Sequence, residues 1–133
     1  MEKQEIQLNE SEDPTFENET MIGVRSNKLG SKTLIGSYVI IPKSQVSSPF
    51  EMNEKEWNDT KLLMEKIKTY LDEKYNPDGY NLGWNVGKAA GQEVAHAHLH
   101  IIPRFSDEPF AGKGIRYLFK QPENIRASLK EDK

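Results

Sequence analysis

The sequence has no cysteine and no excess of positive charge. Without cysteine, disulfide bonds and thiolate zinc sites are excluded, and a reducing compartment is favoured. The formal net charge is −3, so the chain lacks the excess of lysine and arginine that binding to long nucleic acid requires. No apolar run reaches the roughly 18 residues of a membrane span, and the N-terminus has no apolar signal-peptide core. We therefore expect a cytoplasmic, single-domain protein with neither a membrane nor a long nucleic acid as its partner.

Histidine is also scarce, and its distribution is the most informative feature of the sequence. The chain contains three histidines, His96, His98 and His100, which alternate with small or apolar residues. This alternation is typical of a half-buried strand, because successive side chains of a strand point to opposite faces. We therefore predict that a strand over residues 94–102 presents all three imidazoles on one face, spaced by roughly 6.5–7 Å.

The segment before the histidines indicates a loop and a second strand. Gly87 and Gly91 bracket a short connection, and glycine allows backbone N–H groups to approach a ligand closely because it has no Cβ. Upstream, residues 80–87 alternate between apolar and polar or small side chains, as a strand does. The sequence thus predicts a hairpin of strands 80–87 and 94–102, with a glycine loop that could hold an anion beside the imidazoles.

The remaining segments predict an α+β fold with a mainly antiparallel sheet. Residues 15–24 resemble two short strand halves around a polar turn, and residues 36–42 form the clearest core strand. One long helix is expected over about residues 54–75. It starts after Asn53, which with Glu56 makes a capping box, and its apolar side chains repeat at helical spacing.

Both ends of the chain are polar or charged. Residues 1–14 are either a tail or a short edge strand, and residues 121–133 are a charged tail that can include a short helix. An aromatic cluster at residues 117–119 precedes this tail and can pack on the domain or on a partner subunit. A single folded domain is therefore expected to span residues 15–120.

Three imidazoles on one face permit two chemistries. They can bind Zn²⁺ with a water as the fourth ligand, or one can attack a phosphorus atom while its neighbours stabilise the charge. Strand spacing hinders convergence of the outer rings on one ion, and the neighbouring Asn85 and Gln92 suit phosphate oxygens better than zinc. The pattern therefore favours catalysis or nucleotide binding without a metal site. A merely solvated strand face is disfavoured, because every histidine of the chain lies here.

The stretch from Asn85 to Pro103 resembles the histidine triad (HIT) family. Its histidines alternate with apolar residues and are followed by two isoleucines. The upstream residues that match the family pattern at its usual spacing are Asn85, Ala90, Gln92 and Val94. Residues 36–43 resemble an earlier strand of the family, and the expected helix falls where the family has its long helix. The resemblance covers about residues 15–105 and implies a HIT-like fold.

The resemblance also implies a hydrolase or transferase that attacks the α-phosphate of a nucleotide and forms a covalent nucleotidyl-histidine. In that mechanism His98 is the nucleophile, the backbone carbonyl of His96 holds the Nδ1 proton of His98, and His100 binds the phosphoryl oxygens. The residues expected to contact the substrate are Asn85, Gly91 and Gln92 at the phosphate and Asn27 at the ribose.

The implied substrate is a nucleoside phosphoramidate or a dinucleoside polyphosphate, with AMP or GMP as the released half. No cofactor is expected, although Mg²⁺ can accompany a polyphosphate substrate. The resemblance further implies a homodimer, which would cover the edges of a small sheet.

Two positions depart from the family pattern. Ser37 stands where many members have a histidine, and Glu93 stands where many have serine or threonine. A carboxylate near the phosphate would oppose an anion. These departures leave a second interpretation open, in which the chain is a nucleotide-binding module with the HIT fold and little or no turnover.

Overall fold

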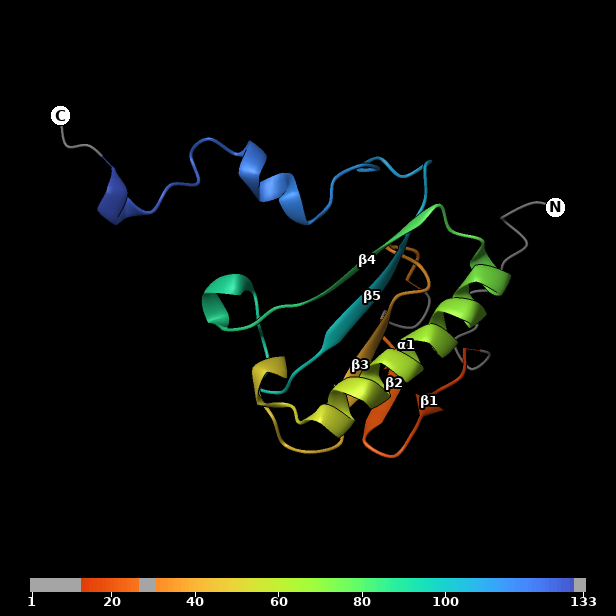
Figure 1. Ribbon diagram of the computed structural model, residues 1–133. Helices are drawn as coiled ribbons and strands as arrows, with labels where there is room; N and C mark the ends of the chain where they lie inside the picture. The colour runs from red at the N-terminus through yellow and green to blue at the C-terminus, as the bar shows by residue number, and fades with distance from the viewer. Residues whose placement is uncertain (1–12, 27–30, 131–133) are drawn as a thin grey trace.

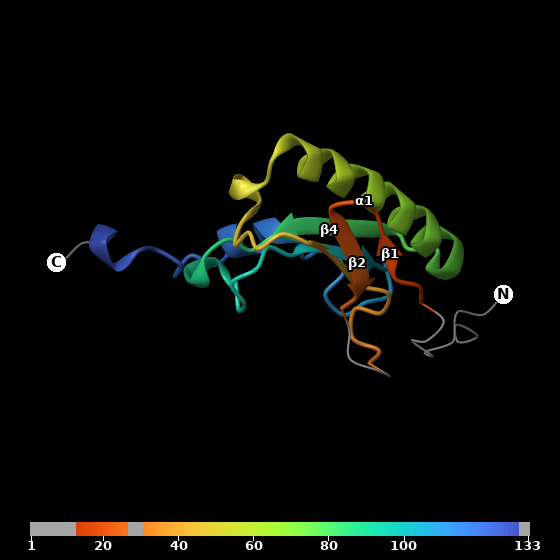
Figure 2. The ribbon, with the colours of Figure 1, turned by 90° about the horizontal axis from the view of Figure 1, so that it is seen from below.

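The computed structural model describes residues 13–26 and 31–130 (Figure 1). A five-stranded antiparallel sheet has the strand order β1-β2-β3-β5-β4. Its strands are β1 (Phe16–Glu17), β2 (Met21–Arg25), β3 (Tyr38–Pro42), β4 (Gly79–Trp84) and β5 (Leu99–Arg104). The long helix α1 (Glu54–Tyr75) lies across one face of this sheet (Figure 2). This architecture confirms the predicted α+β fold.

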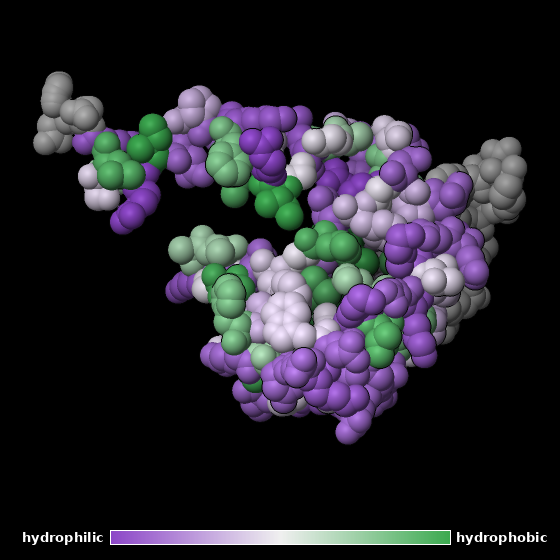
Figure 3. All heavy atoms as spheres, viewed as in Figure 1, coloured by the Kyte–Doolittle hydropathy of each residue, from purple (hydrophilic) through white to green (hydrophobic). Residues whose placement is uncertain are grey.

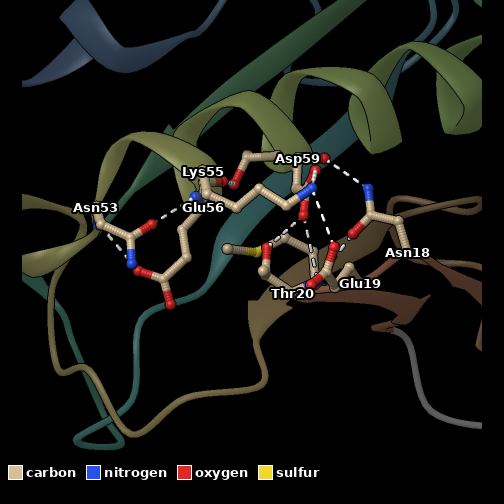
Figure 4. A network of polar contacts seen from close by, with 9 residues as sticks. Asn18, Glu19, Thr20, Asn53, Lys55, Glu56 and Asp59 are labelled. Carbon is tan, nitrogen blue, oxygen red and sulfur yellow. Dashed lines mark hydrogen bonds and ion pairs between the residues drawn. The ribbon is translucent and has the colours of Figure 1, made fainter.

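Helix α1 begins and ends where the sequence predicts, because local side chains fix both ends. At the start, the Glu56 N–H donates to Asn53 Oδ1 at 2.8 Å, and the Asn53 N–H donates to Glu56 Oε1 at 2.9 Å (Figure 4). At the end, Asn76 adopts the left-handed conformation with φ 51°, and its N–H bonds the carbonyl of Asp72 at 3.1 Å. Asparagine tolerates this conformation better than most residues.

One face of the sheet and the inner stripe of α1 form the core. The buried apolar residues of this core include Leu63, Ile67 and Leu71 from the helix and Tyr38, Ile40, Leu99 and Ile101 from the sheet. Gly23 of β2 lies directly beneath the helix, and a Cβ there would come within 2.7 Å of Ile67 Cδ1. The turn between β1 and β2 is also tied to α1, since Thr20 Oγ1 donates to Asp59 Oδ2 at 2.7 Å (Figure 4).

A buried carboxylate joins the start of the described chain to α1 and β2. The Asp13 side chain is 1% exposed and pairs with the guanidinium of Arg25 and with Lys74 Nζ. The hydroxyl of Tyr70 also donates to it, and the hydroxyl of Tyr75 lies 3.3 Å from Asp13 Oδ2. Of the segment 1–14, which was predicted to be a tail or an edge strand, residues 1–12 lie outside the described residues.

Strands β4 and β5 pair as predicted, but both proposed ranges were wrong. The pairing runs from Gly79 opposite Arg104 to Trp84 opposite Leu99, instead of joining strands 80–87 and 94–102. Beyond this last pair the chain leaves the sheet, and the Ala97 N–H donates to the carbonyl of Val46 at 3.0 Å. The carbonyl of Val46, which lies outside the sheet, thus takes the place of the strand neighbour that would otherwise bond to Ala97. Of the three histidines, only His100 lies in a strand.

After β5 the chain forms a loop and then an arm that extends away from the sheet (Figures 1 and 3). The arm touches β4 at its start, where Ile115 Cδ1 would be 3.8 Å from a Cβ on Gly83. The Arg104 guanidinium anchors the loop by donating to Glu108, to Asn81 Oδ1 at 2.6 Å and to the carbonyls of Phe110 and Lys113. The arm contains two short 3-10 helices, Ile115–Lys120 and Ala127–Leu129. Among the described residues, no helix has the length and apolarity to cross a membrane.

Candidate active site

The ring of His98 is held in one tautomer by the backbone before it. His98 Nδ1 lies 2.6 Å from the carbonyl oxygen of His96. A carbonyl only accepts hydrogen bonds, so Nδ1 carries the proton, and in the neutral ring Nε2 then has a free lone pair. This is the contact that the family resemblance implies for the nucleophile.

The ring of His96 points elsewhere and holds its own segment in place. His96 Nε2 lies 2.9 Å from the carbonyl of Pro42 and 3.0 Å from the carbonyl of Ser44. Both partners are acceptors, so Nε2 must be the protonated nitrogen and cannot act as a base. Together with the hydrogen bond from Ala97 to Val46, this fixes residues 96–97 against the chain that follows β3. His96 therefore positions His98 through its backbone carbonyl.

His100 completes the row of imidazoles from within β5. Its ring stacks on that of His98, with centroids 6.4 Å apart and planes inclined by 20°. The rings of His96 and His98 are 6.2 Å apart and nearly perpendicular. Burial, helped by the neighbouring His98, lowers the pKa of His100 below its usual value. At neutral pH His100 is thus uncharged and can offer one N–H to a phosphoryl oxygen.

The glycine loop is held closed by Gln92. Gly87 and Gly91 have φ of 89° and 104°, in the region that favours glycine, and they flank the 3-10 turn Lys88–Ala90. Gln92 Oε1 accepts from the Gly87 N–H at 2.8 Å, while Nε2 donates to the carbonyl of Ser47 at 2.8 Å. The amide that we expected at the phosphate therefore spans the loop and ties it to the segment after β3.

A cavity of about 390 Å³ lies along the histidines. Its lining residues are Asn85, Gly91, Gln92, Glu93, Val94, His96, His98 and His100. The structure thus brings together every predicted site residue except Asn27, which lies outside the described residues. Asn85 sits beside the glycine loop, where a Cβ added to Gly91 would be 3.5 Å from its Nδ2.

Ser37 has a structural role that its position in the sequence does not reveal. It is buried, and its hydroxyl donates to the carbonyl of Leu34 at 2.6 Å. Leu34 has φ of 49°, which is uncommon for a residue other than glycine. The hydroxyl at the place of the family's histidine thus stabilises a tight turn before β3.

The segment from Pro42 to Ser47 is the part of the site that sequence reasoning missed. It contributes only backbone carbonyls, to His96, to Ala97 and to Gln92. No side-chain pattern marks such acceptors, because every residue has a carbonyl. The folded chain alone shows that they hold both the histidine segment and the glycine loop.

Comparison with known proteins identifies the class to which this fold and site belong. The model of the HIT domain matches residues 13–107, so the chain belongs to the histidine triad (HIT) family. A crystal structure of a HIT family protein from Bacillus anthracis has a TM-score of 0.61 and 30% identity, covering 69% of this chain and 63% of that one.

Two curated relatives carry named activities. The chain is 37% identical to the bis(5′-adenosyl)-triphosphatase of Dictyostelium discoideum over 71 residues, which are 53% of this chain and 48% of that protein. It is 32% identical to the adenosine 5′-monophosphoramidase hnt1 of Schizosaccharomyces pombe over 92 residues, which are 69% of this chain and 66% of that protein. The matches therefore span about half to two thirds of these relatives.

Proposed function

We propose that this protein is a nucleotide hydrolase or transferase that attacks the α-phosphate of a nucleoside phosphoramidate or a dinucleoside polyphosphate. The observation that carries the proposal is the His98 ring, which lines the cavity and whose Nδ1 proton is held by the His96 carbonyl, so that Nε2 keeps a lone pair for attack on phosphorus. Membership of a family with relatives named as a triphosphatase and a phosphoramidase supports it.

The proposed reaction has two displacements at phosphorus. In the first, His98 Nε2 forms a bond to the α-phosphorus, and the bond to the leaving nitrogen or oxygen breaks. The leaving group departs with the electron pair, and a leaving amine takes a proton from solvent. In the second, a water oxygen bonds to phosphorus, the Nε2–P bond breaks, and its electron pair returns to His98. The water proton is released, so a phosphoramidate and water give an amine and a nucleoside monophosphate.

The surroundings of His98 suit this sequence of steps. Its Nδ1–H stays on the His96 carbonyl while the ring carries positive charge, and the bound phosphoryl oxygens offset that charge. The uncharged His100 can donate to one of those oxygens. Gln92 keeps the glycine loop in place beside them.

We expect the protein to hydrolyse adenosine 5′-phosphoramidate in a buffer that contains a chelator such as EDTA. The reason is that the proposed nucleophile and oxygen donors are protein groups, so attack on a phosphoramidate needs no metal. Release of AMP, followed by chromatography with and without EDTA, measures this. Activity that is abolished by EDTA and restored specifically by Zn²⁺ would contradict the mechanism. Binding of AMP without turnover of phosphoramidates or dinucleoside polyphosphates would favour the binding-module alternative.

We further propose that the protein is a homodimer in which the arm at residues 115–130 packs on the second copy. Its exposed apolar side chains include Ile115 at 72%, Leu118 at 63%, Phe119 at 79%, Ile125 at 53% and Leu129 at 68%. Exposed apolar groups gathered on one segment are typical of an interaction surface. Strand β4 is an edge strand of the sheet. Leu82 of β4 and Trp57 of α1 are also exposed and could extend this apolar surface.

Replacing both Leu118 and Phe119 by serine is expected to shift the dimer toward the monomer, because it removes the apolar surface of the arm. Light scattering at micromolar concentration should give about twice the chain mass of 15.3 kDa for the unaltered protein and a lower value for the variant. Phe50→Ser is the matched control, since Phe50 is 84% exposed but precedes α1. An unaltered chain that is monomeric, or a variant with unchanged mass, would refute the proposal.

A further inference from the structure

The cavity along the histidines lacks the lysine and arginine side chains expected of a site that binds a polyphosphate. Of the eight residues that line it, all within the described part of the chain, Glu93 alone has a charged carboxylate and none is lysine or arginine. The histidine facing the phosphate from β5 is uncharged at neutral pH, since burial lowers the pKa of His100. An anionic ligand therefore meets one carboxylate and no lysine or arginine side chain in this lining.

Across residues 13–26 and 31–130, no ion pair joins Glu93 to a lysine or arginine. Lys88 is the cation that approaches it, because both line the shallow hollow on the outer side of the glycine loop together with Gly91. Lys88 does not line the cavity along the histidines. Glu93 lines both and is exposed, so it lies at the rim between the cavity and the outer hollow, on a side from which a leaving group can reach solvent.

The two candidate substrate classes place opposite charges at this rim. Cleavage of a dinucleoside polyphosphate expels a nucleoside phosphate that is strongly anionic, and a carboxylate repels it. Cleavage of a phosphoramidate expels an amine, and that amine can carry a second, positively charged group. Such a group would be attracted to Glu93 in the bound substrate and in the transition state.

We infer that Glu93 selects the leaving group, favouring phosphoramidates whose amine bears a second cationic group over substrates with an anionic leaving group. The inference rests on the proposed function, and it narrows the substrate class of the same site. Glu93 acts here by charge at the rim of the cavity. His98 and its oxygen donors keep the roles described above.

The test uses three adenosine 5′-phosphoramidates of similar length whose amines are 1,2-diaminoethane, propylamine and β-alanine. Their leaving groups differ chiefly in being cationic, neutral or anionic. The ratio of kcat/KM for the cationic substrate to that for the anionic one is measured in the unaltered protein and in Glu93→Gln. Comparing this ratio between proteins cancels the intrinsic reactivity of each amine.

Glu93→Gln is expected to lower the ratio by about 5- to 20-fold, because the attraction for the cationic substrate and the repulsion of the anionic one are both lost, and each contributes a few-fold. Glu93→Thr, which carries the family's residue type, should lower it equally. The ratio of the unaltered protein should also fall at high salt, where exposed charges are screened. Glu73→Gln is the matched control, since it removes the same charge from an exposed position near the far end of α1 and should leave the ratio unchanged.

Several outcomes separate this inference from the proposed function. If the substrates are turned over with dependence on His98 but the ratio is the same in Glu93→Gln, the inference is wrong and the proposed function stands. The same holds if Glu73→Gln changes the ratio as much, because the effect would then belong to net charge. If a dinucleoside polyphosphate is turned over but none of the three phosphoramidates is, the inference is again wrong and the proposed function stands. If none of these substrates is turned over, the proposed function fails and takes the inference with it.

Discussion

The variant His98→Ala is expected to lose about 10⁴-fold or more in kcat, the scale seen when a member of a catalytic set is removed. The loss should be this large because, among the described histidines, His98 is the one whose Nδ1 proton is held on a backbone carbonyl so that Nε2 keeps its lone pair. His96 Nε2 is committed to the carbonyls of Pro42 and Ser44 and has no lone pair to attack with. Steady-state release of AMP from a phosphoramidate measures kcat, and calorimetric titration with AMP should show that binding is largely kept.

Two further variants calibrate this expectation. His100→Ala and Gln92→Ala should be milder, at about 10²–10³-fold, as for the loss of one oxyanion donor or of the group that holds it. The covalent intermediate should be trapped by quenching a labelled substrate without acid, and peptide mapping should place the nucleotidyl group within residues 96–100. Near-native turnover by His98→Ala, or a label on another residue, would show that the mechanism is wrong.

Features of this chain that depend on neighbours in sequence could be predicted. Both ends of α1 follow from Asn53, Glu56 and Asn76, whose side chains or conformations act on the adjacent backbone. The core strand β3 follows from its run of β-favouring residues. The pairing of β4 with β5 also follows, because the two segments are close in sequence and of similar pattern.

Features of the chain that depend on backbone groups distant in the sequence could not be predicted. Alternation of histidines with apolar residues predicts a strand through His96, yet the chain leaves the sheet before Leu99 to meet the carbonyls after β3. Similarly, Gln92 was expected at the phosphate, and its amide instead joins Gly87 to Ser47. In both cases the side chain lines the cavity along the histidines, while the carbonyl that holds it lies in a distant segment that sequence patterns do not mark.

The largest effect on stability is expected at the buried Asp13. Asp13→Ala should lower the free energy of unfolding by about 3–5 kcal/mol, because it leaves Arg25 and Lys74 without their shared carboxylate in a buried setting. The hydrogen bond from Tyr70 is lost as well. Urea denaturation followed by circular dichroism measures the change. Asp107→Ala, at an exposed position after β5, is the control and should stay within about 0.5 kcal/mol.

The pH dependence of this difference distinguishes a charge effect from a loss of packing. Burial alone would raise the pKa of Asp13, but the hydrogen bonds from Lys74 and Tyr70 and the charges of Lys74 and Arg25 outweigh it and hold that pKa below its usual value. A carboxyl whose pKa is lowered by folding stabilises the protein above its unfolded pKa of about 3.9. The stabilisation is lost as the pH falls through the folded pKa. The difference in stability between the unaltered protein and Asp13→Ala should therefore be full at pH 7 and shrink below about pH 4. A difference that is the same at pH 7 and pH 3 would assign the loss to packing and refute the ionic role of Asp13.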